Sequence, residues 1–257
     1  MKRPEHVDIL YGVHPVLAAL SAGRRKVETL YIAAGKENHS RHQPILEVAQ
    51  ARHIAIHEMP ARDIEQMAQT RVHQGVAARV SAYPFVPLSE LLATARTAGD
   101  PFLLVADGVT DPQNLGALAR TALCAGVNGM IIPKDNAASP TPAAVKASAG
   151  AVEFLPIARE TNISRALEVL KEAGLWIAGL DGSGEKTIYD SDLNGPLALV
   201  VGGEGRGIRR LVGRNCDFIL SIPQTSLVSS LNASAAGAIA MYEVFRQRQV
   251  KAGAACS

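Results

Sequence analysis

Short apolar runs alternate along this chain with longer segments in which apolar residues recur every three or four positions. The short runs are typical of buried strands, and the longer pattern is typical of helices that pack along one face. In the N-terminal part, the pattern predicts strands at 7–11, 27–33, 54–57 and 76–81, with helices at 14–22, 44–52 and 61–68. We therefore expect a small α/β domain over residues 1–82.

Residues 83–87 contain two prolines and predict a stiff linker. Beyond it, the pattern predicts helices at 88–98, 115–125, 143–149, 163–173 and 233–248, and strands at 102–106, 129–132, 154–157, 175–180, 197–201 and 218–222. Strands that alternate with helices form a mostly parallel sheet covered on both faces. We expect residues 88–257 to be a second, larger α/β domain.

Two loops near the C-terminus look suited to hold a ligand by backbone atoms. One spans residues 199–208 and the other residues 222–234; each follows an apolar run and leads into a helical pattern. In open α/β sheets, ligands lie beyond the carboxyl ends of the strands. Gly202, Gly203, Gly205 and Gly207 allow close approach of the backbone. Glu204 would repel a pyrophosphate, which favours a ligand with a cationic part or an uncharged ring.

Composition limits the classes of protein. No run of 18 apolar residues and no signal peptide is found, so we expect no membrane span. The three cysteines, Cys124, Cys216 and Cys256, are far apart, as expected in a reducing cytoplasm. The net charge of +2 neither requires nor excludes nucleic acid. We expect no metal site, because no thiolate or carboxylate cluster accompanies His53 and His57.

Several polar residues stand out against their local pattern. Asn114 lies where a helix is predicted to begin, so capping alone would explain it. Arg120 lies on an otherwise apolar helix, where it needs a partner such as Glu204 or a phosphate. Ser230 and Asn232 precede the final helix, whose small residues at 233–238 predict close packing. Lysine and arginine cluster at 24–26, 206–210 and 246–248. Such basic clusters are more often solvated surface than phosphate sites.

Taken together, three stretches carry a specific resemblance. They are Asp107-Gly108-Val109-x-Asp111-Pro112-x-Asn114-Leu115-Gly116 with Arg120, then Val201-Gly202-Gly203-Glu204-Gly205-Arg206-Gly207, then Ser230-Leu231-Asn232-Ala233-Ser234. In order and spacing they resemble the three motifs of the SpoU/TrmH RNA 2′-O-ribose methyltransferases of the SPOUT superfamily. The start Tyr11-Gly12-x-His14-Pro15-Val16 is similar to the RNA-binding extension of one branch, which methylates a guanosine ribose in the peptidyl-transferase region of 23S rRNA.

The resemblance implies a SPOUT α/β-knot, a deep trefoil knot in the C-terminal domain that general folding rules disfavour. It implies a homodimer with the active site near the interface. The implied cofactor, S-adenosylmethionine, would contact Gly202, Gly203, Ile222, Pro223, Leu231 and Asn232. The implied catalytic set is Asn114, Arg120, Glu204, Ser230 and Asn232. One departure from the family pattern is Gln224-Thr225-Ser226, where relatives often carry Met and Gly.

An arginine resists deprotonation, so we interpret Arg120 as an electrostatic and phosphate-positioning group that Glu204 and Asn114 orient, with the base unidentified. The N-terminal domain carries no catalytic group. We expect it to bind RNA through Arg24, Arg25, Lys26 and Arg41. Arg120 of the second domain is a further expected RNA contact.

Three other functions remain open from the sequence. A tRNA ribose methyltransferase of the same family is one, although such enzymes typically rely on basic terminal extensions. An RNA-binding protein that has lost catalysis is another, which the presence of all five polar motif residues disfavours. A nucleotide-binding module at residues 181–187 is the third, but Glu185 precedes Lys186 where a P-loop needs glycine.

Overall fold

The computed structural model describes residues 7–35, 40–97, 99–205, 207–225 and 230–254. The chain forms two compact units. The first contains residues 1–84 together with residues 140–154, and the second contains residues 85–139 and 155–257. The sequence-based division did not include residues 140–154 in the N-terminal unit, because nothing in their pattern distinguishes them from the flanking helices and strands.

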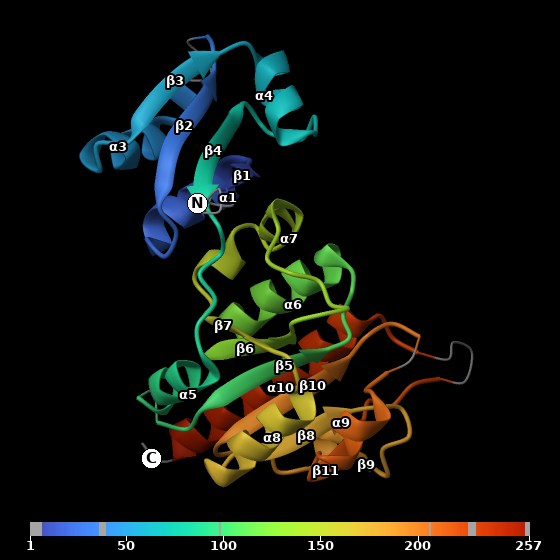
Figure 1. The fold of residues 1–257 in the computed structure, drawn as a ribbon. Helices are drawn as coiled ribbons and strands as arrows, with labels where there is room; N and C mark the ends of the chain where they lie inside the picture. The colour runs from blue at the N-terminus through green and yellow to red at the C-terminus, as the bar shows by residue number, and fades with distance from the viewer. Residues whose placement is uncertain (1–6, 36–39, 98, 206, 226–229, 255–257) are drawn as a thin grey trace, which may run out of the picture. The chain divides into compact units, whose positions relative to one another are not determined.

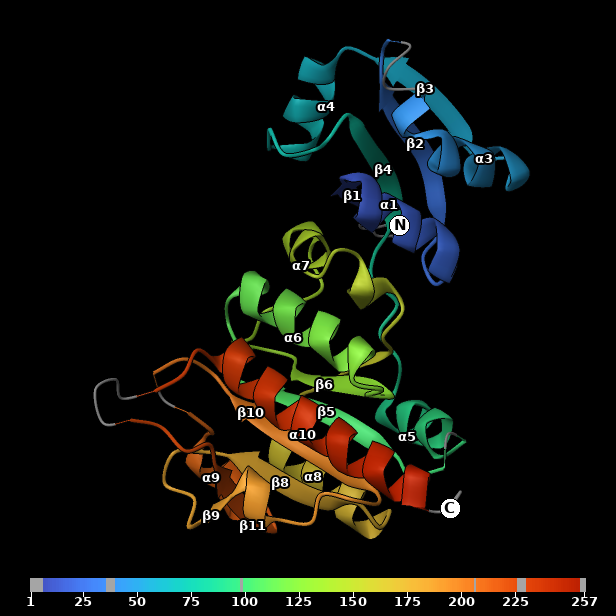
Figure 2. The same ribbon diagram turned by 180° about the vertical axis from the view of Figure 1, so that it is seen from behind.

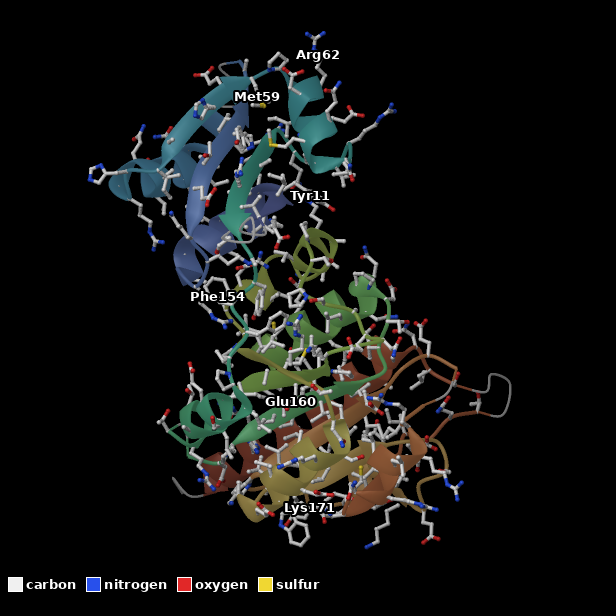
Figure 3. The ribbon with its side chains drawn as sticks, viewed as in Figure 1. Tyr11, Met59, Arg62, Phe154, Glu160 and Lys171 are labelled. Atoms are coloured by element: carbon white, nitrogen blue, oxygen red, sulfur yellow. The ribbon has the colours of Figure 1, made fainter. Side chains whose placement is uncertain are left out.

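The first unit contains a four-stranded sheet of order β1-β4-β2-β3. Its strands are β1 (Val7–Tyr11), β2 (Val27–Ala33), β3 (Ala55–Met59) and β4 (Val76–Ser81), and its helices include α1 (Val13–Ala22), α3 (Gln43–Ala51) and α4 (Ala61–Ala68). β4 pairs antiparallel with β1 and β2, whereas β2 pairs parallel with β3. Tyr11 and Met59, labelled in Figure 3, pack against the buried cluster of Ala33, Ile64 and Ala77. The predicted small α/β fold is therefore present.

Residues 140–154 belong to this first unit through buried polar contacts. They include α7 (Pro142–Ala147) and the short 3-10 helix η1 (Ala151–Glu153). The fully buried Arg25 side chain lies 3.1 Å from the carboxylate of Glu153, pairs with Asp8 at 2.7 Å and donates to the Pro140 carbonyl at 3.1 Å. The Tyr83 hydroxyl donates to the Val152 carbonyl, and burial raises the pKa of Tyr83 to about 12. A buried charge needs such partners, so Arg25 serves the fold of this unit.

The second unit contains a seven-stranded sheet of order β7-β6-β5-β10-β8-β11-β9. The strands are β5 (Phe102–Asp107), β6 (Gly129–Pro133), β7 (Ile157–Glu160), β8 (Trp176–Leu180), β9 (Lys186–Thr187), β10 (Leu197–Gly202) and β11 (Phe218–Ser221). In the described residues, all its neighbouring strands pair in parallel, which confirms the predicted fold class. The carboxyl ends of β8, β10 and β11 therefore lie at one edge of the sheet.

Helices cover both faces of this sheet. The helices are α5 (Leu88–Arg96), α6 (Pro112–Cys124), α8 (Ile163–Glu172), α9 (Arg210–Arg214) and α10 (Ala233–Ala254). Figure 2 shows α6 and α10 side by side on one face. On the other face, in front in Figure 1, α5, α8 and α9 contribute side chains to one buried apolar cluster with β5, β6, β8 and β10. Both faces of the strands are thus withdrawn from water, as continuous apolar runs require.

The close packing predicted for the final helix is confirmed. A Cβ added to Gly237 would collide with the Leu118 side chain of α6. At the other end of α10, Arg248 donates to the carbonyls of Asp100 and Gly195, at 3.0 and 2.6 Å, and Arg246 pairs with Glu243 at 2.7 Å. Arg248 therefore anchors the helix to two neighbouring loops, whereas the Arg246 pair lies within the helix itself.

Some boundaries and two short elements differ from the prediction. The strand expected at 154–157 begins only at Ile157, because Pro156 has no N–H to donate to a neighbouring strand. The helix α9 and the two-residue strand β9 were not predicted, since neither is long enough to show a period. Within the described residues, no helix has the length and apolarity needed to cross a bilayer.

Candidate active site

A cavity lies beyond the carboxyl ends of β8, β10 and β11. Its volume is about 340 Å³. It is lined by the ends of these strands, by the three loops that follow them and by the start of α10. The lining residues are Leu180, Asp181, Gly182, Val201, Gly202, Gly203, Glu204, Gly205, Gly207, Leu220, Ile222, Gln224, Ser230, Leu231, Ala233 and Ala236. Both loops singled out in the sequence contribute, so the chain brings them together as predicted.

The loop after β10 folds back on itself, and this explains its glycines. Gly203 and Gly207 form an antiparallel bridge, with Gly207 N–H donating to the Gly203 carbonyl at 3.2 Å. A Cβ on Gly202 would overlap the backbone of Gly207, and one on Gly203 would overlap the backbone of Gly108. These glycines therefore permit contact between two stretches of backbone as well as approach to a ligand.

An ion pair between the half-exposed Arg209 and the buried Asp107 fastens this loop to the first motif. Asp107, which is fully buried at the end of β5, accepts hydrogen bonds from the backbone N–H of Arg209 at 3.0 Å and from its Nε at 2.7 Å. The guanidinium Nη2 of Arg209 also contacts the carboxylate of Asp107. Arg209, suspected in the sequence only as surface charge, thus fixes the position of the glycine loop.

Three residues from the three motifs form a triangle of hydrogen bonds. Nδ2 of Asn114 donates to Oε1 of Glu204 at 2.5 Å, and Nδ2 of Asn232 donates to the same oxygen at 2.9 Å. Nδ2 of Asn232 also lies 3.0 Å from Oδ1 of Asn114. Asn114 lies 90 residues from Glu204 and 118 residues from Asn232 in the sequence. Only the fold brings these residues into contact.

The capping role expected of Asn114 is wrong, whereas that expected of Asn232 is confirmed. The cap of α6 is Asp111, whose side chain accepts from Gln113 N–H at 3.0 Å. Pro112 follows as the first helical residue, so the helix begins earlier than its apolar period suggested. Oδ1 of Asn232 accepts from the N–H groups of Ser234 and Ala235 at the start of α10.

Arg120 lies on the exposed side of α6. Asn114, six residues earlier, is buried, so the two side chains point in different directions as their spacing predicted. The expected pairing of Arg120 with Glu204 is wrong: in the part of the chain that the structure describes, Glu204 is bonded to Asn114 and Asn232, and Arg120 has neither hydrogen bond nor ion pair. Its guanidinium remains available to a ligand.

The other predicted ligand contacts fall in two groups. Gly202, Gly203, Ile222, Leu231 and Ser230 line the cavity. Pro223 is exposed beside Ile222 and is not among the lining residues, and neither are Asn114, Arg120 and Asn232.

Sequence reasoning missed Asp181 and Gly182. Their segment had been weighed only as a P-loop, and its turn, with Ser183 N–H donating to Asp181, agrees with the rejection of that motif. Its position after a predicted central strand was the signal that could have identified both residues.

The expected RNA contacts in the N-terminal unit need one correction. Arg25 is buried and paired with Asp8 and Glu153, so it cannot reach a phosphate in solution. Arg24 is half-buried and donates to the Tyr83 hydroxyl at 2.9 Å. Lys26 and Arg41 are exposed. Two of the four expected cations therefore remain fully at the surface of this unit.

The arrangement defines a class of protein. The fold is a parallel β-sheet covered by helices on both faces. Its ligand cavity is lined by glycine backbone, apolar side chains and two carboxylates, and the triangle of Asn114, Glu204 and Asn232 lies at the rim. Among the described residues, no group of three or more histidine, cysteine, aspartate or glutamate side chains could hold a metal ion. Such a site suits a small organic ligand with an apolar ring and a cationic part.

Comparison with known proteins identifies the family. Residues 101–242 match the SpoU rRNA methylase family, and residues 9–86 match the RNA 2′-O ribose methyltransferase substrate-binding domain. The chain is 43% identical to the 23S rRNA (guanosine-2′-O-)-methyltransferase RlmB of Pseudomonas aeruginosa, over 93% of this chain and 96% of that one. It is 41% identical to RlmB of Pseudomonas putida, over 95% of this chain and 98% of that one.

Solved structures agree with this result. The SpoU methyltransferase AviRb from Streptomyces viridochromogenes, in complex with the cofactor AdoMet, superposes with a TM-score of 0.78 at 26% identity, covering 95% of this chain and 91% of that one. The chain belongs to the SpoU rRNA methylase family.

Proposed function

We propose that this chain transfers a methyl group from S-adenosylmethionine to the ribose 2′-hydroxyl of a guanosine in 23S rRNA. The observation that carries the proposal is the triangle of Asn114, Glu204 and Asn232 at the rim of the cavity. The names of the relatives supply the substrate class. A 23S rRNA substrate also implies a cytoplasmic location. The predicted trefoil knot involves the loop that contains residues 226–229, which lie outside the described residues, and it stays a prediction.

The residues present fit S-adenosylmethionine. Leu180, Val201, Leu220 and Ile222 offer apolar surface for an adenine ring, and the glycine backbone offers hydrogen-bonding groups. The carboxylates of Asp181 and Glu204 suit a ligand with a sulfonium and an ammonium group. When bound, this cofactor supplies an electrophilic methyl group. The protein must orient the acceptor hydroxyl, and the hydroxyl proton must pass to a base as the oxygen takes the methyl group.

We propose separate roles for the polar residues. The two amide groups of Asn114 and Asn232 hold the Glu204 carboxylate in one position, and Ser230 and Asn232 order the second loop. Arg120, with an available guanidinium, positions a phosphate of the RNA and favours negative charge that develops on the attacking oxygen. Its exposed place on α6 leaves it free to meet RNA.

The experiment that tests the proposed function is methylation of defined RNA. We expect the protein, with S-adenosylmethionine and unmodified 23S rRNA, to introduce a single 2′-O-methylguanosine that resists alkaline cleavage. A tRNA pool serves as the competing substrate. Methylation of tRNA with none of 23S rRNA would replace this proposal by the tRNA enzyme of the same family.

We propose that the N-terminal unit, predicted as residues 1–82, binds the RNA substrate. Lys26 and Arg41 supply exposed positive charge there, which attracts phosphates. We expect the double variant Lys26→Glu/Arg41→Glu to bind 23S rRNA fragments about tenfold more weakly, since each reversal removes one attraction and adds a repulsion. Filter binding at fixed ionic strength measures this.

Charge-reversal variants test this role more cleanly than a deletion. Removing residues 1–80 would leave Glu153 in a unit without Arg25 and could disturb folding. The control is Arg165→Glu on α8 of the second unit, an exposed arginine that should leave RNA affinity unchanged. Equal affinity of the double variant and the wild type would contradict the assignment.

We also propose a homodimer that forms through α6 and α10. These adjacent helices expose Leu123 (40%) and Tyr242 (50%), and Arg120 lies on the exposed side of the same α6. Burial of such apolar side chains against a second copy would stabilise the pair. It would also place Arg120 near the contact, as expected for an active site next to the interface.

We expect Tyr242→Glu to convert the dimer to a monomer, because a carboxylate would be buried without a partner. Light scattering after gel filtration measures the mass. Val72→Glu, at a similarly exposed apolar residue (58%) of the first unit, should leave the dimer intact. A dimeric Tyr242→Glu protein, or a monomeric wild type, would count against this interface.

A further inference from the structure

Asp181 is a cavity residue whose carboxylate is held firmly. It follows β8, and its backbone N–H donates to the Leu220 carbonyl of β11 at 3.0 Å. Oδ1 of Asp181 accepts from the backbone N–H of Ser183 at 3.0 Å and from its hydroxyl at 2.7 Å. These hydrogen bonds fix both the backbone of Asp181 and one of its two carboxylate oxygens.

The second oxygen, Oδ2, accepts no hydrogen bond from the residues that the structure describes. It lies beside Gly207, where an added Cβ would be only 2.8 Å away, and Asp181 and Gly207 both line the cavity. Among the described residues, none donates a hydrogen bond to Oδ2 or forms an ion pair with it. A half-buried carboxylate oxygen without a protein donor needs water or a ligand to satisfy it.

The described residues that line the cavity carry charge of one sign. Asp181 and Glu204 both line it, and the lining residues that the structure describes include no lysine, arginine or histidine. Glu204 already accepts two amide hydrogen bonds, whereas Oδ2 of Asp181 accepts none from the described part of the chain. The field in the cavity therefore favours a cation, with Asp181 as its free counter-charge.

We propose that Asp181 makes this cavity selective for the positively charged methyl donor over its neutral, demethylated product. The inference rests on the proposed function. S-adenosylmethionine and S-adenosylhomocysteine share the adenosine, the ammonium and the carboxylate, and they differ in the methyl group and the sulfonium charge. Attraction to Asp181 through the sulfonium is lost in the product, which favours exchange of product for fresh donor.

The effect on affinity should be moderate. A charge several ångströms from the carboxylate, in a cavity open to water, gains roughly 1 kcal/mol, which corresponds to about fivefold in Kd. Removing only the charge of Asp181 should weaken the donor by that factor. The product should change little, because its uncharged sulfur has no such attraction.

Calorimetric titration of the full-length protein without RNA tests this inference. The ligands are S-adenosylmethionine and S-adenosylhomocysteine, and the variant is Asp181→Asn, which keeps an Oδ1 acceptor for Ser183. We expect the Kd of the donor to rise about fivefold and that of the product to stay within about twofold. Glu185→Gln removes an exposed carboxylate from the same loop outside the cavity and should match the wild type.

Ionic strength gives a second measurement on the wild-type protein. Added salt should weaken the donor more than the product, and Asp181→Asn should lose most of this difference. Equal weakening of both ligands by Asp181→Asn would mean a structural role and would overturn the inference, as would two unchanged affinities. A wild type that binds neither ligand would refute the proposed function itself, and this inference with it.

Discussion

Replacing Arg120 with alanine is expected to abolish RNA methylation while leaving the Kd of S-adenosylmethionine within about threefold of the wild-type value. Arg120 is exposed, does not line the cavity and pairs with no described residue, so neither the fold nor the cofactor pocket depends on it. Loss of a preorganised positive group beside a developing negative charge costs up to about a thousandfold in kcat. Single-turnover methylation of 23S rRNA and calorimetry of the cofactor measure the two quantities.

Two further variants sharpen the Arg120 experiment. Arg120→Lys keeps the charge but loses the planar fork that binds phosphate in two places, so it should retain only part of the activity. Arg165→Ala on α8 removes an exposed arginine far along the chain and should be fully active. A fully active Arg120→Ala protein would refute the electrostatic role.

Asn232→Asp is expected to lower kcat about a hundredfold without lowering the melting temperature. The carboxylate can still accept from the N–H groups of Ser234 and Ala235, and a negative charge at a helix start is favourable. It cannot donate to Asn114 or Glu204, and it would place two carboxylates in contact. The variant thus separates the capping role of Asn232 from its role in the triangle.

Ser234→Ala is the matched control for Asn232→Asp. It removes the hydroxyl that donates to Oδ1 of Asn232 at 2.6 Å but leaves the triangle untouched. We expect its kcat to stay within about twofold of the wild type. An Asn232→Asp protein with normal kcat would show that the triangle is not what the reaction needs.

The sheet of the second unit could be predicted because its strands are buried on both faces. Runs such as Leu197–Gly202 are apolar throughout. In the helices between the strands, apolar residues recur every three or four positions. The ends of helices and strands were predicted less well where a capping residue or a proline, rather than the apolar repeat, decides where the element begins. Asp111 and Pro112 start α6 before its first apolar residue, and Pro156 delays β7.

The partners of the site residues could not be predicted in the same way. Sequence motifs indicated that Asn114, Glu204 and Asn232 act together, but not that Glu204 would bond the two asparagines rather than Arg120. Arg25 was expected at the surface because its neighbours Arg24 and Lys26 are basic. It pairs instead with Asp8 and Glu153, and Glu153 lies in a segment that no local pattern connects with it.

The inclusion of residues 140–154 in the first unit has a consequence for biosynthesis. The last strand of its sheet, β4, ends at Ser81, yet Glu153 and Val152 complete the contacts of Arg25 and Tyr83. The ribosome must therefore translate β5, α6 and β6 before the N-terminal unit can close. This nascent chain does not mature in strict order from its start: Arg25 can pair with Asp8 early, but its second carboxylate, that of Glu153, is added only by a later codon.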